Sequence, residues 1–174
     1  TSINGSIFLG VDAGNSATSA SYSNFLGASA GYQATNASYS NFLGWSAGHF
    51  AASSFNSNLL GYQSGYNATS SSNSNFLGYQ SGYNATSSSN SNFLGYQSGY
   101  GASNSSNSIF IGRQSGLNDT VNNTATYDDT TTFANTSILI GHKTSTGGNS
   151  NSIALGAYAT NSAVNQFKIG SIQR

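Results

Sequence analysis

A repeat of 17 residues constrains the fold of this chain more than any other feature of its sequence. A glycine that ends a short apolar run marks each repeat, at Gly10, Gly27, Gly44, Gly61, Gly78, Gly95 and Gly112. Three later marker glycines follow at intervals of 29, 15 and 14 residues, at Gly141, Gly156 and Gly170. A fixed period of this size is typical of a solenoid, in which each repeat forms one turn.

The residues of the repeat indicate β-structure. Residues 73–89 and 90–106 are nearly identical, and neither shows the i, i+3, i+4, i+7 apolar spacing of a helix. Phe, Tyr and Thr around paired glycines fit short strands and turns. The sequence predicts an all-β, parallel β-roll of about ten coils, each with two short strands, in which like residues stack about 4.8 Å apart. The second glycine of each repeat, such as Gly82, is expected at a tight bend that needs positive φ or no Cβ.

The spacing of the marker glycines divides the chain into three parts. Residues 1–118 are predicted to form the regular 17-residue coils. Residues 119–136 are predicted to be an inserted loop, because the interval of 29 is one period plus 12 extra residues. Residues 137–174 are predicted to form shorter coils.

The strand before each marker glycine is apolar on both faces. The residue just before the glycine is Leu or Ile, and the preceding one is usually Phe or Leu. Adjacent strand residues point to opposite faces, so both faces of the strand are expected to be buried. The Phe face can fill the coil against the small residues of the return strand, such as Ala68 and Ala85, but the Leu face needs a partner.

Self-association of parallel chains about an axis is the simplest way to cover the Leu face, and a homotrimer is predicted. The residues expected along the trimer axis are Leu26, Leu43, Leu60, Leu77, Leu94, Ile111, Asn24, Asn41, Asn58, Asn75 and Asn92. The asparagines lie three residues before the marker glycines, on the Leu face, where a hydrogen-bonded ladder would fix the register of the chains. The alternative is that this face is open and the asparagines are solvated.

Charge excludes several classes of function. Charged residues make up 5% of the chain and the net charge is zero, so the basic surface of a nucleic-acid or anionic-membrane binder is missing. No apolar run is long enough to cross a membrane. No cofactor is predicted. An enzyme is disfavoured because only His49 and His142 could act as imidazole bases, and no Asp lies in the coil of His49.

The C-terminal coils resemble a known family. Residues 152–156, Ser-Ile-Ala-Leu-Gly, with residues 157–160 are similar to the head repeats of YadA-like trimeric autotransporter adhesins, and residues 165–171 resemble the segment that leads from such heads into a neck or stalk. The 17-residue units look like a longer variant found in phage tail fibres and bacterial surface proteins. The resemblance implies a left-handed trimeric roll, an extracellular, cell-surface or virion location, and a role in adhesion or host recognition. Two departures are the Phe in place of the small residue two before the glycine, and Lys168 at that position in the last coil, whose interior is therefore expected to be open.

Aromatic side chains recur at fixed places and are candidate ligand contacts. A rod with stacked tyrosines and amides could bind sugars, although such ladders also pack and seal a solenoid. The candidates in these rows are Tyr62, Tyr66, Tyr79, Tyr83, Tyr96 and Tyr100. One coil differs from its neighbours, because Trp45, His49, Phe50 and Phe55 replace the usual residues. These four are expected to form an exposed apolar patch or a local repacking of the roll.

Three of the four aspartates, Asp119, Asp128 and Asp129, fall in the predicted insertion. Together with Asn and Thr oxygens they are a weak candidate for a Ca²⁺ site, since the spacing matches no calcium loop; solvated turn residues are the favoured interpretation.

Three functions remain open on the sequence. The first is a structural or adhesive segment of a trimeric fibre that contacts a host-cell surface, with a glycan or a protein receptor as partner. The second is an ice-binding solenoid, although Thr69 and Thr86 recur only once per coil. The third is a passive rigid spacer.

Overall fold

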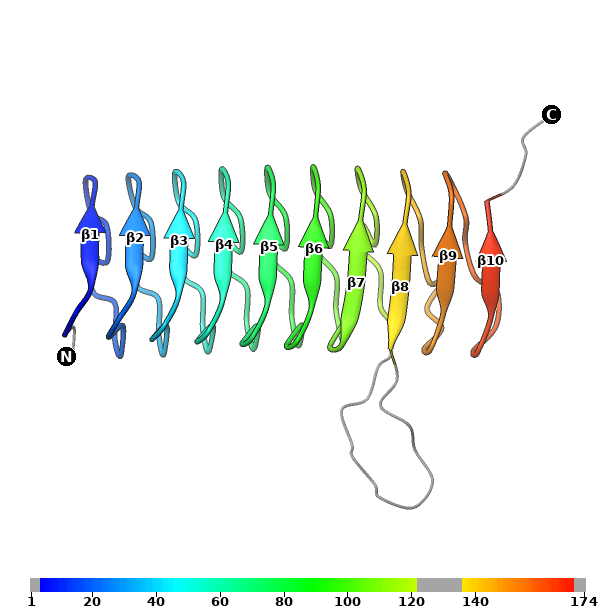
Figure 1. Cartoon of the computed structure of the whole chain (residues 1–174), viewed down its shortest axis with the longest axis horizontal. Helices are drawn as coiled ribbons and strands as arrows, with labels where there is room; N and C mark the ends of the chain where they lie inside the picture. Colours follow the sequence, from blue (N-terminus) through cyan, green and yellow to red (C-terminus); the bar gives the residue numbers. More distant parts are fainter. Residues whose placement is uncertain (1–3, 122–135, 171–174) are drawn as a thin grey trace, which may run out of the picture.

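The computed structural model describes residues 4–121 and 136–170, and these form a β-solenoid. Ten strands make one parallel sheet in which the spatial order is the sequence order (Figure 1). The strands are β1 (Ile7–Leu9), β2 (Asn24–Leu26), β3 (Asn41–Leu43), β4 (Asn58–Leu60), β5 (Asn75–Leu77), β6 (Asn92–Leu94), β7 (Ser108–Ile111), β8 (Ser137–Ile140), β9 (Ile153–Leu155) and β10 (Phe167–Ile169). The predicted all-β solenoid with a 17-residue repeat is confirmed.

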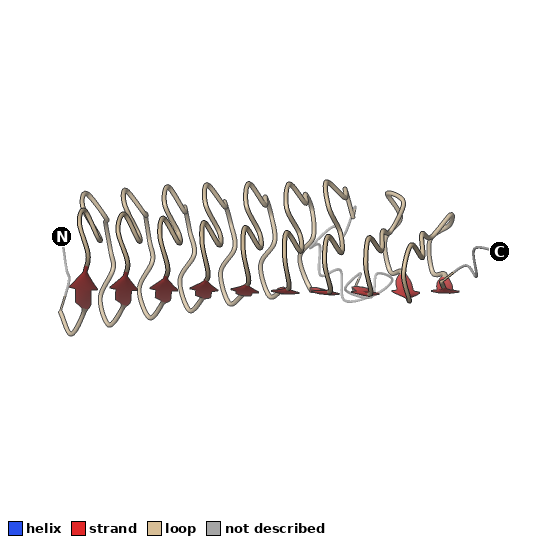
Figure 2. Cartoon of the chain, turned by 90° about the horizontal axis from the view of Figure 1, so that it is seen from above, coloured by secondary structure: helices blue, strands red, loops and turns tan. Residues whose placement is uncertain are grey.

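The register of the sheet follows the sequence repeat. Each residue of β5 pairs with its equivalent in β6, so that Asn75, Phe76 and Leu77 face Asn92, Phe93 and Leu94. The coils therefore stack as copies, and the strands lie along one side of a straight rod (Figure 2).

The prediction of a second strand in each coil is wrong: the return path of the described coils contains single-residue bridges and no strand. On the return path, the coils pair only through single bridges, such as Thr69 with Thr86. Turns with left-handed backbone replace the expected strand. In the coil that follows Gly61, positive φ occurs at Gln63, Asn67, Ser70 and Asn73, with φ between 51° and 56°.

These left-handed residues form the hydrogen bonds that the missing strand would have formed. Each of the four donates its N–H to a carbonyl of the preceding coil, at 2.7–3.0 Å, and the acceptors are Trp45, His49, Ala52 and Phe55. Strand-like residues such as Thr69 instead donate to the following coil, here to Ala85 O at 2.9 Å. Because buried backbone groups need partners and Asn tolerates left-handed backbone best among non-glycine residues, the Asn- and Ser-rich composition suits this path.

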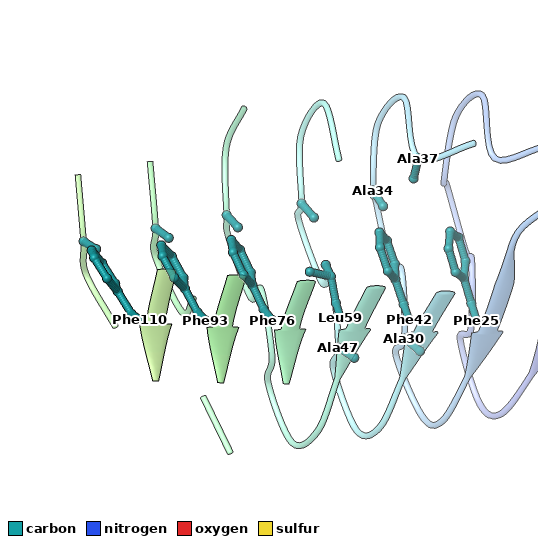
Figure 3. Packing of buried hydrophobic residues seen from close by; sticks show 14 of the residues in the cluster. Phe25, Ala30, Ala34, Ala37, Phe42, Ala47, Leu59, Phe76, Phe93 and Phe110 are labelled. Atoms are coloured by element: carbon teal, nitrogen blue, oxygen red, sulfur yellow. The ribbon is translucent and has the colours of Figure 1, made fainter. Parts of the chain in front are cut away.

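The interior is a stack of phenylalanine rings. Phe76, Phe93 and Phe110 are fully buried and lie parallel, with ring centroids 4.6 Å apart (Figure 3). Phe8, Phe25 and Phe42 form a second such stack, and Leu59 lies between the two stacks. Alanines of the return path, such as Ala34, pack against the rings, so the predicted Phe–Ala interior is confirmed.

The marker glycines and the second glycines both lie too close to other atoms to carry a Cβ. A Cβ on Gly78 would lie 2.5 Å from the carbonyl oxygen of Gly95, because the backbones of successive coils touch at the marker glycines. At Gly82 the obstacle is the ring of Phe76, which lies over the bend, and φ is +63°. The predicted bend with positive φ at the second glycine is confirmed.

Buried serines satisfy the remaining polar backbone groups of the interior. Ser57 Oγ donates to Ser71 O at 2.8 Å and accepts the N–H of Ser74 at 3.2 Å, and the same pattern recurs along this row of serines. On the other side of the strand, Ser81 Oγ donates to Phe93 O at 2.7 Å. A small hydroxyl at each position therefore joins one coil to the next without disturbing the ring stack.

Residues 119–121 still stack on the preceding coil. Thr120 still bridges to Ser103, and Val121 is fully buried. In the last coil, Lys168 of β10 pairs with Ala154 and is half-buried.

Candidate functional site

The outer face of the sheet carries an uninterrupted row of aliphatic side chains. We call it the aliphatic row; its members are Leu9, Leu26, Leu43, Leu60, Leu77, Leu94, Ile111, Ile140, Leu155 and Ile169. The side chains in β2–β7 and β9 are half-buried, whereas Leu9 and Ile169 at the two ends are each 68% exposed. In a single chain this face of the sheet meets solvent.

A row of asparagines runs beside the aliphatic row. The Nδ2 of one asparagine donates to the Oδ1 of the asparagine in the next coil, at 2.8 Å. The row consists of Asn24, Asn41, Asn58, Asn75 and Asn92. The predicted asparagine ladder therefore forms between the coils of one chain. Towards both ends of the rod the position becomes apolar, with Ile7, Ile109, Ile138, Ile153 and Phe167.

The two rows bound a shallow groove along β2–β5. It has a volume of about 350 Å³ and is lined by the asparagines and leucines of these four strands. The residues predicted for a trimer axis thus lie together on one face, with no charged side chain among them.

A stack of aromatic rings follows the marker glycines on the surface. Trp45, Tyr62, Tyr79 and Tyr96 lie with centroids 4.9–5.2 Å apart and planes within 14° of parallel. The guanidinium of Arg113 lies over Tyr96, 5.5 Å from its centroid. We call these four rings the outer ladder. Each is 41–49% exposed, so the ring edges and the tyrosine hydroxyls face solvent while most ring faces are covered by neighbours.

A second stack, the inner ladder, follows the second glycines. Tyr32, His49, Tyr66, Tyr83 and Tyr100 are spaced 4.8–4.9 Å apart. Phe50 lies edge-on against His49, with centroids 4.1 Å apart. The unusual coil is therefore built into both ladders: Trp45 and Phe50 are exposed, whereas His49 and Phe55 are partly buried.

Burial between two neutral rings lowers the pKa of His49 below its usual 6.5. Its Nδ1 is buried, and within the described part of the chain no hydrogen-bond partner lies at this atom. A lowered pKa means that the unfolded chain takes up a proton more readily than the folded one, so stability is full above pH 6.5 and falls as the pH drops below it. We expect a small loss of melting temperature between pH 7.5 and pH 5.

The matched variant is His49→Tyr, which continues the inner ladder without an imidazole. Melting curves of both proteins at pH 7.5, 6 and 5 should show a smaller loss in the variant. An equal loss in both proteins would mean that His49 is not the titrating group.

Asp119 has a structural partner that weakens its case as a calcium ligand. Thr146 donates to its carboxylate twice, from N to Oδ2 at 2.5 Å and from Oγ1 to Oδ1 at 2.7 Å, and Asp119 is buried. Asp128 and Asp129 lie outside the described residues. In residues 4–121 and 136–170 no group of three His, Cys, Asp or Glu side chains could hold a metal ion.

Asp119 therefore joins the last regular coil to the coil that follows the marker Gly141. We expect Asp119→Asn to destabilise the protein by about 1.5–3 kcal/mol, since at this buried site one of the two acceptor oxygens is replaced by a donor and the remaining hydrogen bond is no longer charge-assisted. Chemical denaturation measures this loss. The same denaturation is measured in Ca²⁺ and in EDTA. If the midpoint of the wild type were higher in Ca²⁺ than in EDTA, and the midpoint of the variant were the same in both, Asp119 would be a calcium ligand.

Two polar features of the surface were missed by the sequence reasoning. The amides of Gln63, Gln80, Gln97 and Gln114 form a hydrogen-bonded ladder at 2.9–3.0 Å beside the outer ladder. Tyr22 stacks on Tyr39, with centroids 5.3 Å apart. The 17-residue period predicts both, because any side chain repeated at that spacing stacks on its own copy.

No protein-family model matches this chain, and no curated protein matches it. Among the residues described, no helix is long and apolar enough to cross a membrane.

Proposed function

We propose that this chain is a rigid segment of a trimeric fibre on a cell or virion surface, and that the sides of the fibre contact glycans. The aliphatic row carries this proposal. It presents ten consecutive aliphatic side chains along one face of the sheet, on a chain in which charged residues make up only 5%.

The size of the exposed face supports self-association. Three strand residues by nine coil steps give a face roughly 10 Å wide and roughly 43 Å long. This face of roughly 430 Å² is shared by the aliphatic row and, in β2–β6, the asparagine row, so its apolar part is smaller; exposed apolar patches of a few hundred Å² commonly mark interaction sites. Burial of the leucines by a second copy would remove them from water along the whole rod.

The shape of the face favours parallel copies around an axis. Copies of one chain have the same coil spacing, so parallel rods can bring leucine against leucine at every coil. Three copies enclose an axis on all sides, whereas two would leave the edges of a narrow row in solvent. The amides of the asparagine row form hydrogen bonds along each chain. If one chain were shifted along the axis by a fraction of a coil, its asparagine and leucine side chains would no longer lie level with those of the neighbouring chains.

The outer and inner ladders support the adhesive part of the proposal. They place aromatic edges, phenol hydroxyls and amides at regular spacing on a surface with almost no charge, which suits neutral, hydroxyl-rich ligands. The uncharged sides also agree with the resemblance to adhesin heads and tail fibres.

A glycan array probed with the assembled protein tests the adhesive role, and an assay of thermal hysteresis runs beside it. We expect binding to a restricted set of glycans and no thermal hysteresis. Hysteresis with an empty array would favour an ice-binding solenoid, to which the single threonine row of Thr18, Thr35, Thr69, Thr86 and Thr120 would then contribute. An empty array without hysteresis would favour a passive spacer.

A further inference from the structure

The two ends of the outer ladder differ. At the C-terminal end, Arg113 covers the last ring, Tyr96. At the N-terminal end the last ring is Trp45, and among the described residues Tyr62 is the ring that stacks on it. The equivalent residue of the preceding coil is Ala28. Among the described residues, the side chain that the repeat places on the other side of the indole is therefore the methyl group of Ala28.

Backbone hydrogen bonds fix this arrangement. Ser46 N donates to Ala28 O at 2.8 Å, and Gln63 N donates to Trp45 O at 2.9 Å. In the coil before Ala28, Ser29 N donates to Val11 O at 2.7 Å. The side chains of Val11, Ala28, Trp45 and Tyr62 thus project from successive coils at the same position of the repeat.

The small side chain of Ala28 leaves a slot one coil high. Val11 and Trp45 are two coils apart, or roughly 9.6 Å, and Ala28 forms the floor between them. The rings of the outer ladder are spaced about 5 Å, so a flat ring above Ala28 would contact Trp45 on one side and Val11 on the other. Trp45 is 49% exposed and Val11 is 76% exposed, which leaves the slot open to solvent.

Polar residues come next in the chain after the residues that form the slot. Ser29 follows Ala28 in the chain, and Asp12 follows Val11. The carboxylate of Asp12 is exposed and accepts a hydrogen bond from Asn15 Nδ2 at 3.1 Å, so one amide and one carboxylate are held together in the turn that follows Val11. An aromatic face with a few polar groups at its rim is the usual composition of a site for a small neutral ligand.

We propose that the slot between Trp45 and Val11 binds one pyranose ring of a saccharide. The apolar C–H face of the sugar stacks on the open face of Trp45, and its hydroxyls meet the polar groups of Ser29 and Asp12. This site rests on the proposed adhesive function and gives it a position on the rod. The outer ladder has one such site in each chain, because its other rings have both faces covered by a neighbouring ring or by Arg113.

Trp45 is the one tryptophan of the chain, so the tryptophan fluorescence of the protein reports directly on this site. The experiment is a fluorescence titration of the assembled protein with maltotriose, N-acetylglucosamine trisaccharide and galactose, with open-chain sorbitol as the non-ring control. We expect a saturable change in emission with at least one pyranose probe and none with sorbitol.

Two variants separate the slot from the rest of the surface. Ala28→Tyr fills the slot, continues the ladder and leaves Trp45 in place; we expect affinity to fall by about tenfold or more. Ala28→Leu is the alternative filler if the first variant does not assemble. Tyr39→Phe removes a hydroxyl from the separate stack of Tyr22 and Tyr39, which belongs to neither ladder, and its affinity should equal that of the wild type.

The outcomes distinguish this site from the fibre proposal. A saturable change that is lost in the filled variant and kept in Tyr39→Phe supports the site. No change with any pyranose, or a change that Ala28→Tyr does not weaken, overturns it. If the array still shows glycan binding in that case, the adhesive function stands and its site lies elsewhere; if the array is empty as well, the adhesive function fails with it.

Discussion

Gly78→Ala is expected to destabilise the protein by about 3 kcal/mol or more, which places it among the most damaging single substitutions. The added methyl would lie 2.5 Å from Gly95 O and 2.8 Å from Gly95 C, and φ at this position is +138°. The obstacle is backbone that is held by hydrogen bonds to the coils on both sides, so it cannot rotate away as a side chain would. Urea denaturation followed by circular dichroism measures the loss.

Gly148→Ala is the matched control. Its φ is +80°, so it carries the backbone penalty of a left-handed residue, and among the described residues the nearest atom that a Cβ would meet is Thr120 O at 3.9 Å. The difference between the two variants reports the close approach of successive coils together with the larger backbone penalty at φ +138° than at φ +80°. Equal losses would show that positive φ alone explains the marker glycines, and that the coils can move apart to admit a methyl group.

Phe76→Ala is expected to cost about 3–5 kcal/mol, the range for a fully buried aromatic side chain. Phe76 has no exposed surface and stacks on Phe93 at 4.6 Å, and its ring also covers the bend at Gly82. Its removal leaves a cavity in an interior that is one ring wide, with no second layer to collapse into it. Thermal melting, with the midpoint and the enthalpy compared to the wild type, reports the effect.

The chain itself supplies the control for this substitution. Leu59 occupies the same position one coil earlier, is fully buried and contacts Gly65 as Phe76 contacts Gly82. Phe76→Leu should therefore cost much less than Phe76→Ala. If the two variants lost the same stability, ring stacking and not the filling of space would hold the interior together.

The sequence predicted the solenoid because its signals are local and repeated. Glycine, phenylalanine and leucine at a fixed spacing define the bend, the interior and the outer face, and stacking of identical coils multiplies each signal. The same period predicted the asparagine row and the tyrosine ladders, which follow once each coil lies on its copy.

The return path was predicted wrongly because its signal has no apolar alternation. A run such as Ala68–Asn73 reads as a short strand followed by a turn, but most of its backbone is irregular. Left-handed residues Ser70 and Asn73 direct their N–H groups to the previous coil, and a single bridge at Thr69 replaces the strand. Asn and Ser occur both in loops and in left-handed positions, so composition alone does not distinguish the two.

The open face of Trp45 could have been found from the repeat. Aligning the coils places Ala28 before Trp45 and Tyr62 after it, so the end of the stack is visible in the sequence. What the sequence does not give is which face of the ring is covered, because this depends on the direction in which the coils stack. The hydrogen bonds from Ser46 and Gln63 supply that direction.

Light scattering of the purified protein at several concentrations tests the central claim, that the aliphatic row is covered by copies of the same chain. We predict a stable mass near three times 17.9 kDa. We also predict a shift to the monomer in the double variant Leu60→Ser with Leu77→Ser, whose changed side chains line the groove and leave the interior untouched. A monodisperse 17.9 kDa wild type over the whole concentration range would contradict the claim and leave a self-sufficient solenoid with an exposed apolar face.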